Sequence, residues 1–180
     1  MFKARGRYES ALIYALTAPR TNLAHVPRSV LALLIENADR AALRAAGDPL
    51  PHPGPFTVYR GVAGRGGARR VLGLSWTFSL PVAAWFARRF DLPDPAVYRV
   101  TVDEAHVLAY VSDREEEELL LVLPEDAWPK RCLMGAELTN AAEARKTAMR
   151  TKRQGELAAI SNKRKALGVD PLAQQQESGS

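Results

Sequence analysis

The chain has little of what metal and thiol chemistry uses. It contains one cysteine, Cys132, which excludes an intramolecular disulfide and a zinc site of four cysteines. A lone cysteine commonly behaves as a small hydrophobic residue, so we expect Cys132 to be buried. The three histidines, His25, His52 and His106, share no metal-ligand spacing and are interpreted as structural. The sequence therefore predicts a protein without a metal site.

Long hydrophobic runs are also missing. The apolar stretch at residues 11–18 has 8 residues, whereas a membrane-spanning helix needs ~20. It is at the lower limit for the apolar part of a secretory signal peptide, and no small-residue cleavage site follows it, so a core helix is the better interpretation. We therefore expect a soluble protein of the bacterial or host cytoplasm, with no membrane partner.

What the chain does have is enough apolar residues for a core and an uneven distribution of charge. Its 180 residues, 47% of them hydrophobic, fit one domain with appended helices. Of the net charge of +5, residues 141–180 carry +4, from 8 Lys and Arg against 4 Asp and Glu, and the remaining residues hold 17 against 16. The basic character thus belongs mostly to the tail.

Periodicity divides the chain into a helical start, a β-rich middle and a helical end. Apolar residues at helical spacing predict a helix over residues 7–17 and a second from Pro27 to Ala45, ended by Gly47. A DNA-reading helix-turn-helix is the alternative, but the second helix lacks a cluster of polar base-reading side chains, so a helical cap is favoured. The predicted division is a helical cap at 1–48, a proline-rich connector at 49–55, a β core at 56–135, a basic helical tail at 136–170 and a disordered segment at 171–180.

Between residues 56 and 123 the period of the apolar residues changes to two, which indicates short strands. Many short strands with few helices between them favour an antiparallel α+β domain over a βαβ-wound one. We expect strands at 56–60, 71–78, 96–102, 106–111 and 118–123, with one short helix at 81–90.

Two segments of this region carry side chains that suit the binding of a phosphate or a carboxylate. Arg60, between Tyr59 and Gly61 near the end of a strand, has a planar fork of donors that fits a pair of phosphate oxygens, although a surface or salt-bridging arginine is the common alternative. Ser75 and Thr77 alternate on one strand face, where hydroxyls can hold a carboxylate in one rotamer. Both residue types are also ordinary on half-exposed strands. The intervening Trp76 is expected in the core.

A third segment is the acidic run from Glu115 to Glu118. Four consecutive carboxylates repel one another, so the run is either a solvated loop or a functional feature. Glu118 opens the hydrophobic stretch 119–122, which would anchor it, and an extended backbone would place Glu116 on the same face. Two carboxylates at the rigid edge of a strand suit a reaction with a cationic transition state.

In this order, the three segments resemble the Arg–Ser–Glu class of mono-ADP-ribosyltransferases, in particular its bacterial toxin and phage-encoded members. The middle motif of that family is usually Ser-Thr-Ser, so Ser75 and Thr77 match its first and last positions and Trp76 departs from it. The alternative register, Thr77-Phe78-Ser79, leaves Ala83 and Phe86 out of place. The resemblance covers residues 56–123 and is carried by Tyr59-Arg60-Gly61, by Ser75-Trp76-Thr77 with Ala83 and Phe86, and by Glu116-Glu117-Glu118-Leu119-Leu120.

The resemblance implies a split β-sandwich of two small antiparallel sheets packed across an NAD cleft, with an N-terminal helical cap and a C-terminal helix. NAD would be a consumed substrate, and no metal would be required. Arg60 would hold the phosphates or the adjoining ribose of NAD, and Ser75 would position Glu118. Glu118 would bind the 2′-hydroxyl of the nicotinamide ribose and stabilise its oxocarbenium-like state, and Glu116 would orient or deprotonate the acceptor. The remaining cofactor contacts would come from Tyr59, Gly61, Thr77 and Phe86.

The resemblance also bears on the acceptor. In this family, a glutamate two positions before the catalytic one goes with arginine acceptors, so Glu116 implies a protein arginine. The basic residues within 141–165 can neutralise phosphates, which leaves RNA or DNA open as the acceptor. A non-catalytic nucleic-acid-binding module and an NAD glycohydrolase that uses water are the other functions to be tested.

Overall fold

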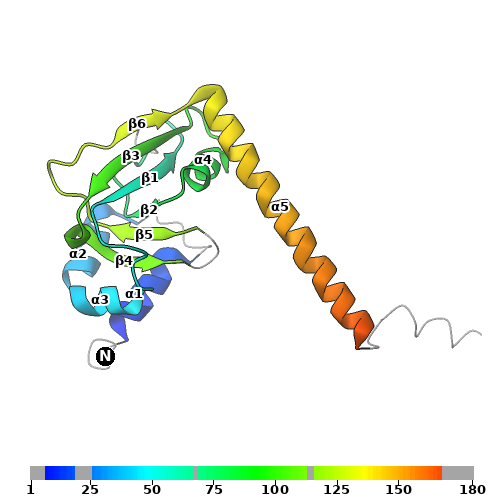
Figure 1. Cartoon of the computed structure of the whole chain (residues 1–180). Coiled ribbons are helices and arrows are strands. Elements are labelled where there is room, and N and C mark those ends of the chain that lie inside the picture. The colour runs from blue at the N-terminus through cyan, green and yellow to red at the C-terminus, as the bar shows by residue number, and fades with distance from the viewer. Residues whose placement is uncertain (1–6, 19–25, 67–68, 113–115, 168–180) are drawn as a thin grey trace, which may run out of the picture. The chain divides into compact units, whose positions relative to one another are not determined.

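The computed structural model describes residues 7–18, 26–66, 69–112 and 116–167, and the segment predicted to be disordered, 171–180, lies outside them. The chain divides into two compact units, Met1–Ala142 and Glu143–Ser180. The first unit combines helices with an antiparallel sheet (Figure 1), which confirms the predicted α+β class. The second unit contains the last part of the C-terminal helix.

A six-stranded sheet forms the centre of the first unit. Its strands are β1 (Phe56–Val62), β2 (Ser75–Thr77), β3 (Ala96–Val102), β4 (Val107–Val111), β5 (Glu118–Leu121) and β6 (Lys130–Leu133). Their spatial order is β4-β5-β2-β1-β3-β6, and every neighbouring pair is antiparallel. Strands were predicted at β1, β3, β4 and β5. The bounds of β3 are those predicted, and the bounds of β1, β4 and β5 differ from the prediction by one or two residues.

The sheet is nearly divided between β1 and β2. Its two halves, β4-β5-β2 and β1-β3-β6, are joined by one register pair, Tyr59 with Thr77. By contrast, β1 pairs with β3 along its whole length. The resemblance implied two separate sheets. The structure instead has one hydrogen-bonded sheet with a narrow join.

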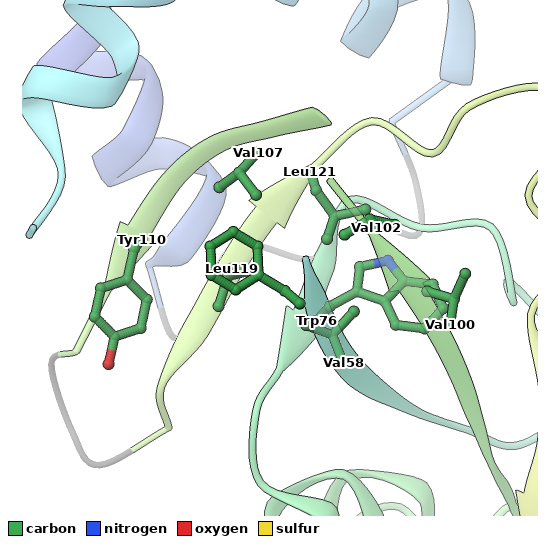
Figure 2. Packing of buried hydrophobic residues seen from close by; sticks show 9 residues of the cluster. Val58, Trp76, Val100, Val102, Val107, Tyr110, Leu119 and Leu121 are labelled. Atoms are coloured by element: carbon green, nitrogen blue, oxygen red, sulfur yellow. The ribbon is translucent and has the colours of Figure 1, made fainter. Parts of the chain in front are cut away.

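Buried side chains from both halves meet in one hydrophobic cluster. The cluster contains Val58 from β1 and Trp76 and Leu119 from β2 and β5, and Figure 2 shows them close together. Trp76 is 1% exposed, as expected for a core residue, and its indole N–H donates to Gly73 O at 2.8 Å. Trp76 packs against side chains of both halves, and its burial stabilises the join where few backbone hydrogen bonds connect them.

Among the described residues, three helices precede the sheet, where the sequence predicted two. They are α1 (Tyr8–Thr17), α2 (Arg28–Glu36) and α3 (Arg40–Ala46). The predicted second helix is interrupted because Asn37 ends α2 and the Asp39 carboxylate accepts from Ala42 N–H at 2.8 Å to begin α3. Leu12 and Leu43, from α1 and α3, pack against β4 and β5. The helices therefore cover one end of the sheet, as the predicted cap requires.

Two more helices follow β2 and β6. Helix α4 (Leu80–Arg88) begins at Ser79, whose side chain caps it, and α5 (Gly135–Ala166) is 32 residues long. Leu138 and Ala142 of α5 are buried against α4 and β3, so the first unit ends at Ala142 and not at the predicted residue 135. None of the helices in the described ranges combines the length and the apolar composition that crossing a bilayer requires.

The predicted bounds of two strands and the predicted burial of Cys132 were wrong. The predicted strand 71–78 is paired only at Ser75–Thr77, and β1 continues to Val62, two residues beyond its predicted end. Strand β6 was missed because its polar residues show no alternation. Cys132 is exposed, since it lies on β6 at the edge of the sheet.

Gly61 allows α4 to lie directly on the backbone of β1. A Cβ atom at Gly61 would lie 2.7 Å from Ala87 N and still closer to Ala83 O, both in the backbone of α4. We expect Gly61→Ala to force α4 outward and to lower the free energy of unfolding by about 1–3 kcal/mol, as overpacking usually does. Urea denaturation followed by circular dichroism measures this change.

Gly155→Ala is the matched control, because nothing lies within 4 Å of a Cβ at Gly155 and alanine is the better helix former. We expect this variant to keep the wild-type urea midpoint or to raise it. A Gly61→Ala variant with the same midpoint would contradict the close contact between α4 and β1.

Candidate active site

The predicted site residues lie on three neighbouring strands, β1, β2 and β5. Tyr59 lies opposite Thr77, and Thr77 lies opposite Glu118. Residues directly opposite each other in antiparallel strands have their side chains on the same face of the sheet. The structure therefore brings these three residues into one row, at the narrow join between the two halves.

Glu118 is held at the start of a firmly packed strand. It is half-buried, and the next residues of β5, Leu119, Leu120 and Leu121, are each 0% exposed. Leu119 packs in the Trp76 cluster and Leu120 in the cluster of α1 and α3, so β5 is covered on both faces. The predicted anchoring of Glu118 by the following hydrophobic strand is confirmed.

Glu116 does not share an extended segment with Glu118. Strand β5 begins at Glu118, and Glu117 has a φ of 46°. This left-handed conformation costs a non-glycine residue about 1–2 kcal/mol. The prediction that an extended backbone puts the two carboxylates on one face is therefore wrong, because the chain turns at Glu117.

The hydroxyl of Thr77 fixes this turn. Thr77 is 5% exposed, and its Oγ1 donates to Glu116 O at 2.6 Å and accepts from Ser79 N–H at 3.0 Å. The backbone N–H of Phe78 donates to Glu117 O at 3.4 Å. Thr77 was predicted as a cofactor contact. The structure assigns its hydroxyl to positioning, since it links the acidic segment to the start of α4.

Arg60 lies where β1 and β2 separate. Its Nε donates to Arg70 O at 3.0 Å, and its Nη1 donates to Ser75 O. The backbone of Gly73 lies against the guanidinium, because a Cβ there would lie 2.9 Å from Arg60 Nε and closer to Cζ and Nη2. The guanidinium thus takes the place of backbone pairing between the two strands.

The charge of Arg60 interacts with that of Glu118. Removal from water lowers the pKa of Arg60 to about 10, the negative charge of Glu118 opposes this shift, and the positive charge of Arg70 adds to it. Arg60 is therefore protonated at neutral pH. Arg70 was not selected from the sequence, although the pair Arg69-Arg70 follows closely after residues 61–67, four of which are glycine.

The other predicted residues lie around this centre with different contacts. Ser75 lies opposite Leu120, so Thr77 and not Ser75 is the hydroxyl residue directly across from Glu118. Tyr59 packs in the cluster under α4, where Gly61 supports the helix. Phe86 contacts Trp85 at 4.9 Å between ring centroids, and Arg89 lies over its ring at 5.5 Å.

An apolar groove lies beyond Gly73, at the far end of β2 and β5. It has a volume of about 260 Å³ and does not include Arg60, Ser75 or Glu118 in its walls. Its lining residues are Leu72, Gly73, Leu74, Leu121, Val122, Leu123, Pro124, Glu125, Ala127 and Trp128. This groove and the row of Glu118 are separate features of the sheet.

Comparison with protein-family models, with curated proteins and with solved structures gives no match to this chain. Within the described ranges, no three or more His, Cys, Asp and Glu side chains are grouped so that they could hold a metal ion. The function must therefore be inferred from the residues of the site themselves.

Thr77→Val tests the positioning of the acidic segment. Valine keeps the shape of the side chain but leaves Glu116 O and Ser79 N–H without their buried partner. We expect the free energy of unfolding to fall by about 1–3 kcal/mol, the usual cost of an unsatisfied buried polar group. Urea denaturation gives the value.

Thr57→Val is the control for this substitution, because the Thr57 hydroxyl is exposed and bonds the exposed Thr101 hydroxyl at 3.2 Å. We expect a change within about 0.5 kcal/mol for this variant. Equal losses in the two variants would show that the Thr77 hydroxyl does not hold the turn.

Proposed function

We propose that this protein is a mono-ADP-ribosyltransferase, which cleaves the nicotinamide–ribose bond of NAD and transfers ADP-ribose to a macromolecule. The position of Glu118 is the main observation that supports the proposal. Its carboxylate stands at the start of a strand covered on both faces, opposite Thr77, and interacts electrostatically with Arg60. Three motifs that are separated along the chain thus come from adjacent strands, as a shared site requires.

The fold of the first unit supports the same proposal. Its two half-sheets meet through a single register pair, and their buried side chains pack together around Trp76. This arrangement is compatible with the split β-sandwich that the resemblance implies. Arg60 on β1 and Glu118 on β5 lie on the two strands that flank β2.

The chemistry follows from the charges of the two residues. Nicotinamide leaves with the electron pair of the C–N bond, and positive charge develops on the ribose. A fixed carboxylate at Glu118 stabilises this charge and accepts a hydrogen bond from the 2′-hydroxyl. The Arg60 guanidinium has five N–H donors, and those that do not bond Arg70 O and Ser75 O can bind the pyrophosphate.

The acceptor then forms a bond to the anomeric carbon and loses a proton. We assign this proton to Glu116, which lies in the turn fixed by Thr77, and we infer that the acceptor is a protein arginine. The acidic segment attracts a guanidinium and repels phosphates. RNA or DNA is the alternative acceptor, and the basic residues of α5 are the observation that favours it.

Glu118→Gln tests the catalytic assignment. The variant keeps the size of the side chain and removes the charge that opposes the cationic ribose. We expect nicotinamide release from NAD to fall about 10²–10³-fold, by analogy with the loss of one electrostatic contact in other active sites. Release is followed by chromatography at saturating NAD.

Glu117→Gln is the control, because Glu117 is the exposed neighbour of Glu118 and carries the same charge. We expect it to release nicotinamide at the wild-type rate. A Glu118→Gln variant with wild-type release, or a wild-type protein that releases none, would refute the enzymatic function.

Glu116→Gln tests the acceptor step separately. With arginine methyl ester as acceptor, we expect transfer to fall about 10²–10⁴-fold, the usual contribution of a general base, while nicotinamide release to water persists. Mass spectrometry measures the ADP-ribosylated ester, and chromatography measures nicotinamide. Parallel loss of transfer and of nicotinamide release would contradict the acceptor role of Glu116. If a cell extract treated with the protein and NAD carries ADP-ribose only on nucleic acid, the acceptor is nucleic acid and not arginine.

A further inference from the structure

The last part of α5 carries a larger net positive charge than the +5 of the whole chain. Residues 143–166 contain 8 Lys and Arg against 2 Glu, a net charge of +6 from 8 − 2. All of these side chains are exposed except Arg145, which is half-buried. Lys146 pairs with Glu143 at 3.2 Å and Lys152 with Glu156 at 3.9 Å, and such exposed pairs contribute about 0.2–0.5 kcal/mol each. The proposed enzymatic function uses none of these residues.

Six of the eight basic residues form two parallel rows on the helix. Arg145, Lys152 and Lys163 are spaced by 7 and 11 residues, and so are Lys146, Arg153 and Arg164. Spacings of 7 and 11 residues are close to whole numbers of helical turns, so each set lies along one line. The two lines are one residue apart in the sequence, which corresponds to about 100° around the helix axis.

The exposed apolar residues of this segment argue against binding in an apolar protein groove. Met149 and Ile160 lie there and are 40% and 51% exposed. A helix that binds in an apolar groove presents anchors at i, i+3, i+4 and i+7. The positions at these spacings after Met149 are Lys152, Arg153 and Glu156. Within residues 143–166, Leu157 and Ile160 are the one pair of exposed large apolar side chains at such a spacing. The charge is therefore the dominant property of this face, and a polyanion is the ligand that it fits.

We propose that residues 143–166 bind the phosphate backbone of duplex DNA. A helix with its side chains is about 10–12 Å in diameter, and the major groove of B-DNA is about 12 Å wide. A helix in this groove would direct one row of cations to each strand. The major groove of A-form RNA is deep and narrow, which excludes the same geometry. Contacts to phosphates do not depend on the base sequence.

The test measures binding of the full-length protein to a fluorescent 30-base-pair DNA duplex by anisotropy. We expect the affinity to fall about 10³-fold or more between 50 and 200 mM salt, as for a protein with six or more phosphate contacts. Lys146→Gln/Arg153→Gln/Arg164→Gln removes one row. We expect this variant to bind at least ~10-fold more weakly at 50 mM salt and to show a smaller salt slope, by about 0.9 for each lost contact.

The matched control is Ala144→Gln/Thr151→Gln/Asn162→Gln, which has the same spacing of 7 and 11 residues on the opposite face. We expect wild-type DNA binding from the control and wild-type nicotinamide release from both variants. No binding at 50 mM salt, or equal binding by both variants, would overturn the proposal. Tighter binding of duplex or single-stranded RNA, or binding to vesicles of anionic lipid but not to DNA, would overturn it in favour of that ligand.

Discussion

The hydrogen bonds of the Arg60 guanidinium determine how the two halves of the sheet are joined. Strands β1 and β2 pair at Tyr59 and Thr77, and the guanidinium then bonds carbonyls of the segment around β2 in place of a continued ladder. Removing a cation from water costs free energy unless the cation is hydrogen-bonded and compensated by an opposite charge. Removal from water lowers the pKa of Arg60 to about 10, and the negative charge of Glu118 opposes this shift only in part.

The position of Glu118 follows from the same constraint. Because β2 lies between β1 and β5, a guanidinium beside β2 also lies close enough to interact with the first residue of β5. The strained backbone of Glu117 and the buried hydroxyl of Thr77 then fix where β5 begins. Backbone strain of this kind persists only where the surrounding contacts enforce it, and it is frequent at functional sites. The site thus consists of an electrostatic interaction between Arg60 and Glu118 across β2 and a turn that is held by the Thr77 hydroxyl.

The parts of the fold that depend on local patterns could be predicted from the sequence, and the parts that depend on long-range contacts could not. Strand β3 follows from alternating apolar residues, and the anchoring of Glu118 follows from the hydrophobic run behind it. The role of Thr77 was missed because its partner, Glu116, is 39 positions away. Strand β6 and the exposed Cys132 were missed because an edge strand has no buried face to reveal it.

The distribution of charge also separates the two proposed ligands. The segment Glu116–Glu118 repels phosphate groups and attracts a guanidinium, whereas residues 143–166 have the opposite preference. If residues 143–166 bind DNA, the phosphates lie on that helix and not on the segment Glu116–Glu118. The acidic segment then remains available for a positively charged acceptor. The two proposals are therefore compatible, because the segment proposed to bind DNA and the segment proposed to receive the acceptor carry opposite charges. DNA itself is disfavoured as the acceptor, because its backbone would have to approach three carboxylates.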